Sequence, residues 1–272
     1  MRKKFLIIII ALLLFLITVS FITLLKDKDS KVSMERIDHS VKSESGKIIA
    51  LIYFDKPSFT ENSQSMIKIK KYFESEYEEW LNGNPSAINF YGDLSISKFF
   101  NQLKNMQSAY DESTLVKHPL EYSVNTELVF FSNDILSFRQ YIHWYSGGPS
   151  DTYVIGSTFN LKTGELIPFT EFNDINASAF KKNLSAFLNK REIEDTFDEY
   201  GINDKYIYEF NEHQWNMSYE YYYDGDFICL ILNHIGIHSG YIVKWNGKVD
   251  NEFKATIWSY GKENKTYYER QL

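Results

Sequence analysis

Basic residues and cysteine are both scarce in this 272-residue sequence, and each shortage excludes a class of protein. The one cysteine, Cys229, cannot form an internal disulfide, so the fold must be held by its core. Cys229 lies in the apolar run FICLIL (227–232). A buried structural thiol is favoured there over a nucleophile, because a nucleophile needs access and a lowered pKa. Cys229 lies far from the apolar N-terminus, so the lipobox cysteine of a lipoprotein is also lacking.

Lysine and arginine number 29 against 36 aspartate and glutamate residues, which gives a formal charge of −7. Residues 1–25 contribute only Arg2, Lys3 and Lys4 to this charge, so the rest of the chain carries −10. A negative field of this size argues against nucleic acid as a partner, and it permits a cationic partner.

The sequence also has no constellation of residues that marks a metal site. His234 and His238 form an H-x-x-x-H pair, which would present two zinc ligands on one face only if it were helical. Gly236 between them and Gly240 after them favour a loop instead. We therefore predict no metal site and no cofactor.

Two other pairs of polar residues have simpler structural interpretations than catalysis. His143 and Ser146 are three residues apart, so in a strand they would point to opposite faces and could not act as base and nucleophile. Asp224 and Asp226 flank Gly225, a sequence typical of a hairpin tip rather than of a catalytic carboxylate pair. We therefore predict no catalytic residue.

The strongest feature that is present is an apolar run, residues 5–25, which begins with Phe5 and ends with Leu25. All 21 residues are uncharged, and 17 of them are Leu, Ile, Phe or Val. A helix of this length spans about 30 Å, the thickness of the hydrocarbon core of a bilayer. Basic residues precede the run, which predicts a cytoplasmic N-terminus and an extracytoplasmic location for the bulk of the chain.

A cleaved signal peptide is the alternative to a retained anchor. Its apolar region is usually shorter and ends in an A-x-A-like site. Here Thr18-Val19-Ser20 matches that site poorly, and the apolar run continues beyond it. We therefore expect a signal-anchored, single-pass protein whose partner through residues 5–25 is the cell membrane.

The remaining composition is that of a folded protein rich in strands. Hydrophobic residues make up 44%, charged residues 24% and aromatic residues 17%, and aromatic residues favour strands. We expect most aromatic side chains to fill cores, although exposed rings could also stack on sugars. The predicted organisation is an anchor over 1–25, a stalk over 26–46 in which residues 32–37 could add a short strand, and two α+β domains over 47–150 and 151–272.

An antiparallel meander is predicted around residues 133–172. Its central strand alternates between two faces, as a half-buried strand does. One face holds Leu136, Phe138, Ile142 and Trp144, and the other holds Ser137, Arg139, Tyr141, His143 and Tyr145. Gly147 and Gly148 then allow a corner before a strand over 153–159, and residues 160–164 form a tight turn.

Elsewhere helices precede strands in each half of the chain, which predicts an α+β fold of mostly antiparallel sheet with packed helices. Helical spacing predicts helices over 63–81 and 95–109, the second with Ser95 as its cap, and a third helix is predicted with Asn176 as its cap and its buried face over 180–188. Turns are predicted between Pro57 and Asn62, at 132–134, at Asp224-Gly225 and at 246–247. The predicted strands outside the meander cover residues 47–54, 122–131, 215–223, 226–232, 241–245 and 253–259.

Three motifs resemble a bacterial extracytoplasmic pair of domains, a PdaC/RsiV-like domain followed by the domain of unknown function 3298. Members carry Y-T-G-G-A-H, T-F-D-L-K-T-G-K and L-x-D-L-F segments in this order. The corresponding segments here are WYSGG (144–148), STFNLKTG (157–164) and PFTEF (168–172). The resemblance covers most of residues 47–258 and implies the two α+β domains.

The resemblance also implies a class of function. Some relatives are anti-sigma factors whose exported part senses lysozyme, and others carry a polysaccharide deacetylase domain. This sequence departs from the pattern at two places. Four residues precede the apolar run, too few to hold a sigma factor, and the family's histidine after the glycine pair is replaced by Pro149 and Ser150.

We expect a non-catalytic ligand-binding or sensor-like domain for a cell-envelope protein or a peptidoglycan-type glycan, with lysozyme as one candidate. The alternatives are an envelope polysaccharide hydrolase or deacetylase-associated protein, and a structural component with no small ligand. The expected ligand-binding residues are Arg139, Tyr141, His143, Tyr145, Gly147 and Gly148. They form a contact surface if their strand face is open, and an ordinary core rim if a helix covers it.

Overall fold

The computed structural model describes residues 32–83, 95–147, 150–169, 221–236, 239–245, 253–261 and 266–271. The anchor expected at 5–25 and the helix expected from Asn176 lie outside these residues. Within them, no helix has the length and apolar character that a membrane span needs.

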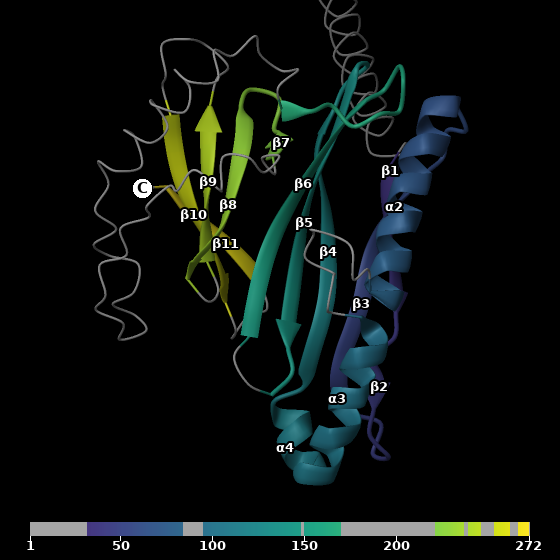
Figure 1. Cartoon of the computed structure of the whole chain (residues 1–272), viewed down its shortest axis with the longest axis vertical. Coiled ribbons are helices and arrows are strands. Elements are labelled where there is room, and N and C mark those ends of the chain that lie inside the picture. Colours follow the sequence, from purple (N-terminus) through teal and green to yellow (C-terminus); the bar gives the residue numbers. More distant parts are fainter. Residues whose placement is uncertain are drawn as a thin grey trace, which may run out of the picture.

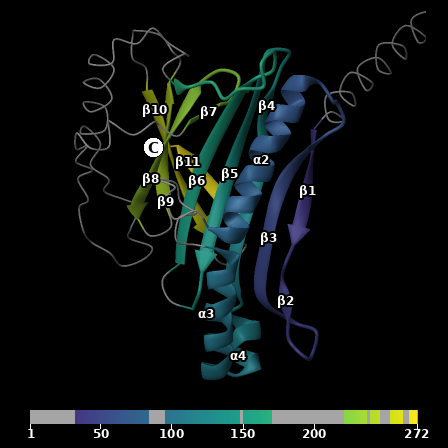
Figure 2. The same cartoon turned by 45° about the vertical axis from the view of Figure 1, so that its right-hand side comes forward.

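The first of two sheets has six strands and carries helices on one face (Figures 1 and 2). Its path runs β1 (Val32–Asp38), β3 (Ile48–Phe59), β4 (Leu120–Phe131), β5 (Ile135–Tyr145) and β6 (Ser150–Asn160), and β2 (Val41–Lys42) pairs with β3. Only β3 and β4 are parallel among its described pairs. A parallel pair requires a crossover, and helices α2 (Gln64–Asn82), α3 (Ile96–Ala109) and α4 (Glu112–Lys117) provide it.

Serine caps set the start of the two long helices. The Ser63 side chain accepts a hydrogen bond from the backbone N–H of Met66, and Ser95 accepts one from Lys98. The helices predicted over 63–81 and 95–109 are thereby confirmed. The six residues of α4 were not predicted, because so short a helix shows no period of its own.

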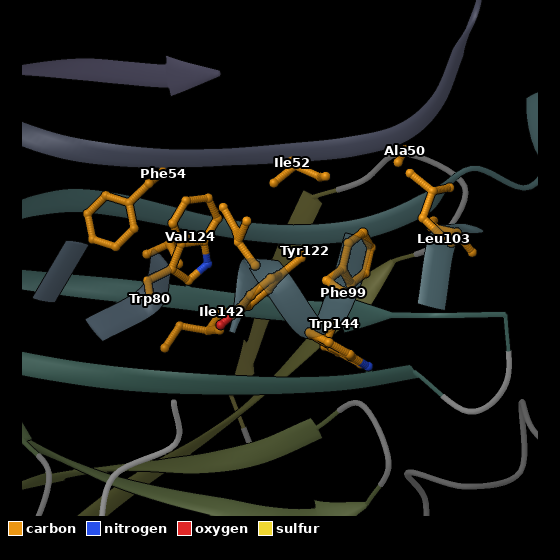
Figure 3. Packing of buried hydrophobic residues seen from close by; sticks show 12 residues of the cluster. Ala50, Ile52, Phe54, Trp80, Phe99, Leu103, Tyr122, Val124, Ile142 and Trp144 are labelled. Carbon is orange, nitrogen blue, oxygen red and sulfur yellow. The ribbon is translucent and has the colours of Figure 1, made fainter. Parts of the chain in front are cut away.

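Two clusters of buried side chains fill the space between the helices and the first sheet. In the larger cluster, the ring of Tyr122 lies 5.2 Å from that of Trp80 and 4.8 Å from that of Trp144 (Figure 3). Each large apolar side chain buried in this way stabilises the fold by about 1.5–3 kcal/mol. The larger cluster comprises Ala50, Ile52, Phe54, Trp80, Ile96, Phe99, Leu103, Leu120, Tyr122, Val124, Ile142 and Trp144. The smaller cluster comprises Val32, Met66, Ile69, Phe73, Leu136, Phe138 and Phe159.

The second sheet is antiparallel and packs on the face of the first sheet that the helices leave open (Figures 1 and 2). Its order is β11 (Thr266–Gln271), β10 (Phe253–Gly261), β9 (Ser239–Trp245), β8 (Ile228–Gly236) and β7 (Tyr221–Tyr223). A third buried cluster joins the two sheets and contains Tyr141, Val154, Tyr222, Cys229, Ile231 and Ile242. The fold is therefore mostly strand with a few helices, in two sheets, as the expected α+β class requires.

The two faces predicted for the central strand of the meander are confirmed in β5 except at its end, where Tyr145 packs against the larger cluster rather than with Tyr141. Leu136 and Phe138 belong to the smaller cluster and Ile142 to the larger one, on the helix side of the sheet. Tyr141 belongs to the cluster on the opposite side. The tight turn after β6 is also confirmed, with Gly164 at φ +75.

The short strand that residues 32–37 could add within the expected stalk of 26–46 is present. Val32–Asp38 forms edge strand β1 and pairs with β3 from Phe59 to Tyr53. β3 also runs through Pro57 to Phe59, so of the turn that Pro57 and Asn62 were expected to mark, Pro57 lies in the strand and Asn62 lies in the connection to α2. β3 pairs with β4 only from Ala50 to Phe54. At Pro57 the strand therefore has β1 as its only partner, and β4 requires no hydrogen bond from the N–H that proline lacks.

Three further differences concern the C-terminal half. β6 pairs with β5 from Asn160 to Ser150, so the division expected at residue 150 does not coincide with the division between the sheets. The hairpin predicted at 224–225 exists, but its closing bond joins Asp224 N–H to the Phe227 carbonyl at 3.1 Å, which centres the turn one residue later. Strand β11 was not predicted, and Gly236 and Gly240 lie at the end of β8 and near the start of β9.

Candidate functional site

The strand face expected to bind a ligand is covered by the second sheet. Tyr141 is 1% exposed and packs against Tyr222, Cys229 and Ile231. This face of β5 is therefore covered rather than open at Tyr141. The sequence suggested a helix as the cover, but the covering element is the second sheet.

Arg139 links the two sheets by charge and by aromatic contacts. Its Nη2 donates to Glu127 Oε2 at 2.8 Å, and its Nη1 donates to the Tyr222 hydroxyl at 3.1 Å. The guanidinium also lies over the rings of Tyr141 and Tyr222, 4.9 and 5.3 Å from their centroids. Burial opposes the charge of Arg139, but Tyr222, Tyr141 and Glu127 outweigh it and raise the pKa of the guanidinium. Arg139 thus fixes the packing of the sheets.

The other expected site residues also have structural contacts. His143 is 3% exposed, and its Nδ1 lies 2.7 Å from Thr152 Oγ1. Tyr145 is half-buried against the larger cluster. Gly147 has a φ of +93, a left-handed backbone conformation that favours glycine, and it lies against the end of the Met106 side chain of α3. Gly148 lies outside the described residues. The set expected from the sequence does not converge on one site.

The register instead places a row of polar side chains across all five main strands on this face. Asp38 pairs with Tyr53, Tyr53 with Ser123, Ser123 with His143, and His143 with Thr152. Residues opposite each other in register share a face, so these five side chains form one line, which we call the polar row.

Within the polar row, Ser123 and His143 are of the types that serve as nucleophile and base. The Ser123 hydroxyl, however, donates to Glu121 Oε1 at 3.1 Å, and Ser123 is 1% exposed. A substrate therefore cannot reach it, and a nucleophile needs both access and a base that takes its proton. Burial also raises the pKa of the neighbouring Tyr53, against a hydrogen bond with Ser123 that lowers it.

The exposed end of the polar row carries a rigid arrangement of Arg36, Tyr53 and Asp55, which we call the arginine platform. Arg36 donates from Nε and Nη2 to the two carboxylate oxygens of Asp55, each at 2.7 Å. Its guanidinium carbon lies 3.9 Å from the centroid of the Tyr53 ring. The bonds to Asp55 raise the pKa of Arg36. The Asp55 side chain is 8% exposed, whereas that of Arg36 is 54% exposed.

The platform can act as a docking point for polar ligands. Its two bonds to Asp55 use Nε and Nη2, so Nη1 keeps donor capacity for a carboxylate, carbonyl or hydroxyl oxygen. Met34, two residues before Arg36 and therefore on the same face of β1, is 36% exposed and adds apolar surface.

Sequence reasoning missed the polar row and the platform, although one signal was present. In β4, Glu121, Ser123 and Asn125 alternate with Leu120, Tyr122 and Val124, which marks a polar face on a strand. The register that aligns this face with Tyr53 and Arg36 depends on pairing between distant segments, so it cannot be predicted from any single segment of the sequence.

No three His, Cys, Asp or Glu side chains are grouped as metal ligands within the described ranges. His234 lies in strand β8, so the H-x-x-x-H pair is not helical, and His238 lies outside the described residues. Lys244, Asp224 and Cys229 form the remaining polar cluster, in which Asp224 Oδ2 lies 3.1 Å from Lys244 Nζ and 3.4 Å from Cys229 Sγ. Burial raises the pKa of the Cys229 thiol, which fits a structural cysteine rather than a reactive one.

Comparison with known proteins finds similarity among solved structures only. No protein-family model matches the chain, and no curated protein matches it. A member of the DUF3298 family from Bacteroides fragilis NCTC 9343 has a TM-score of 0.46 and 11% identity, over 75% of this chain and 83% of that chain. A DUF3298 family protein from Pseudomonas aeruginosa PAO1 has a TM-score of 0.36 and 10% identity, over 57% of this chain and 63% of that chain.

Both neighbours belong to the family that the motifs of residues 144–172 resemble. The PdaC/RsiV-like part of the resemblance has no counterpart in these comparisons. At such identities and TM-scores, the likeness carries no argument about activity or ligand.

Proposed function

We propose that this protein is an extracytoplasmic binding module, held at the cell membrane by residues 5–25, which binds a cell-envelope protein or glycan without catalysing a reaction. The arginine platform is the observation that carries the proposal. The apolar N-terminal run supports the location, since 21 uncharged residues follow a basic N-terminus.

The platform is suited to binding because it is already ordered. An exposed arginine on a free side chain loses rotamer freedom when it binds, which costs about 0.5–1.5 kcal/mol. In this protein Asp55 and Tyr53 hold the Arg36 guanidinium in place before a ligand arrives. A ligand with carboxylate or hydroxyl groups therefore meets a donor that needs no further ordering.

The surroundings of the platform favour a ligand of mixed character. Met34, two residues before Arg36 in β1, provides exposed apolar surface on the same strand. Envelope glycans and peptides both combine apolar faces with hydroxyl or carboxylate groups, which fits a cation next to apolar surface. Lysozyme is the specific protein candidate that the resemblance names, and the formal charge of −10 beyond residue 25 favours such cationic proteins.

Titration calorimetry on the full-length protein in nanodiscs tests the proposal, with soluble peptidoglycan fragments and lysozyme as ligands. Arg36→Ala removes the platform donor and should weaken binding of the ligand about tenfold, the loss of one charge-assisted contact. Lys162→Ala is the matched control, because it removes another exposed cation, paired with Asp134 at 2.7 Å. Equal binding by the wild-type protein and Arg36→Ala would rule out the platform as the binding point.

A further inference from the structure

We propose that the end of the first sheet where β1 begins lies against the membrane surface. We call this end the α2 end, because α2 also begins there. Its first helical turns and the turn at 161–165 would contact phospholipid headgroups. The inference rests on the anchor in the proposed function and adds the orientation of the folded part.

The tether between anchor and fold is short. Six residues, KDKDSK (26–31), separate Leu25 from Val32, the first residue of β1. Seven Cα steps reach at most about 25 Å when fully extended. β3 alone has 12 residues and is about 40 Å long. The distance between the start of β1 and the membrane is therefore shorter than the length of the sheet.

Three segments meet at the α2 end. Val32 pairs with Phe59, the last residue of β3, and packs with Met66 of the first helical turn. The turn after β6 lies against the same part of α2, since a Cβ at Gly164 would be 2.5 Å from the Ser65 carbonyl oxygen. Figures 1 and 2 both show the start of β1 beside the start of α2.

The surface of the α2 end matches a lipid headgroup layer. Ile67 is 36% exposed and Leu166 is 44% exposed, so both can enter the boundary between headgroups and acyl chains. Lys68 and Lys162 are also exposed, and each is paired with a carboxylate: Glu165 at 2.5 Å and Asp134 at 2.7 Å. Paired charges next to apolar side chains suit zwitterionic phospholipids, which carry both signs of charge themselves.

The opposite end of the sheet offers a matched control. Tyr110 follows α3 and is 47% exposed. α3 packs near Leu120 and Ala50, at the ends of β4 and β3 that lie farthest from Phe59. The proposed orientation therefore points Tyr110 away from the membrane.

Spin labels test the orientation in the full-length protein reconstituted in phosphatidylcholine vesicles that contain a nickel-chelating lipid. Ile67→Cys, Leu166→Cys and Tyr110→Cys each receive a nitroxide, and the native Cys229, at 0% exposure, does not compete for label. The lipid-borne nickel should relax the labels at 67 and 166 several-fold more than the label at 110. A water-soluble nickel chelate should relax all three, which controls for accessibility.

The outcomes separate this inference from the proposed anchor. Carbonate extraction is performed on the same vesicles, and release of the protein would overturn both the anchor and the orientation. Retention of the protein with equal relaxation at all three positions, or with stronger relaxation at 110, would overturn the orientation alone.

Discussion

The backbone of Gly156 in β6 lies directly against the backbone of Tyr221 in β7. A Cβ at position 156 would overlap the Tyr221 carbonyl group and lie 2.8 Å from the Tyr222 nitrogen. Gly156 is also the register partner of Arg139, which bonds to the Tyr222 hydroxyl. The two sheets therefore approach closely where the arginine links them, and a glycine makes this approach possible.

Gly156→Ala should destabilise the protein by about 1–3 kcal/mol, because the new methyl group meets backbone atoms that cannot rotate away. Urea unfolding followed by tryptophan fluorescence measures the loss. Gly46→Ala is the control, since it has φ +80 but nothing within 4 Å of an added Cβ. It should cost about 1 kcal/mol of backbone strain, and a larger effect at 46 than at 156 would contradict the close approach of the sheets.

Arg139→Met should lower the free energy of unfolding by about 1–3 kcal/mol, because it removes bonds to Glu127 and Tyr222 at a side chain only 17% exposed. Lys162→Met is the comparison, since Lys162 and its partner Asp134 are 76% and 63% exposed. Loss of such a surface pair costs about 0–1 kcal/mol. Thermal or urea unfolding measures both variants, and similar losses would show that Arg139 does not join the sheets.

Asp224→Asn should change how stability depends on pH. Burial raises the pKa of Asp224, but bonds from the Phe227 backbone and Lys244 outweigh burial and hold the pKa below its ordinary value of 3.8. A carboxylate with a depressed folded pKa stabilises the fold above the unfolded pKa, and this contribution is lost as pH falls through the folded pKa. The wild-type protein should therefore exceed Asp224→Asn in stability at pH 7, and the difference should shrink below pH 3.8. Urea unfolding at pH 7 and below pH 3.8 measures the free energy of unfolding of both proteins. If the wild-type protein exceeds Asp224→Asn by the same amount at both pH values, Asp224 has no ionic role.

Lysozyme binding should raise the melting temperature of the full-length protein in nanodiscs as lysozyme concentration increases. A ligand at 100 times its Kd stabilises the folded state by about 2.7 kcal/mol. The charge of −10 beyond residue 25 steers a cationic partner, so the shift should weaken at about 0.3 M salt but persist, because docked contacts are not removed by screening. Another small basic protein of similar charge is the control. If the control protein raises the melting temperature equally, or if salt abolishes both increases, the interaction with lysozyme is nonspecific electrostatic attraction.

Features that depend on neighbours a few residues apart could be predicted from the sequence. Ser63 and Ser95 set the starts of α2 and α3, and Gly164 forms the turn after β6. The alternation in β5 predicted correctly that Phe138 and Tyr141 lie on opposite faces. Each of these follows from local hydrogen bonding or from the two-residue period of a strand.

Only the tertiary structure decided which element packs against each face of a strand. Alternation showed that Arg139, Tyr141 and His143 share one face, but the sheet that covers them comes from residues beyond 220. The arginine platform likewise needs β1 and β3 in register, with Arg36 opposite Asp55, 19 residues away in sequence. The sequence by itself determined the two long helices, the turn at Gly164 and the alternation in β5, because these depend on local geometry. Only long-range pairing decided which faces became core and which side chains form a site, because register and sheet packing are fixed by contacts between distant segments.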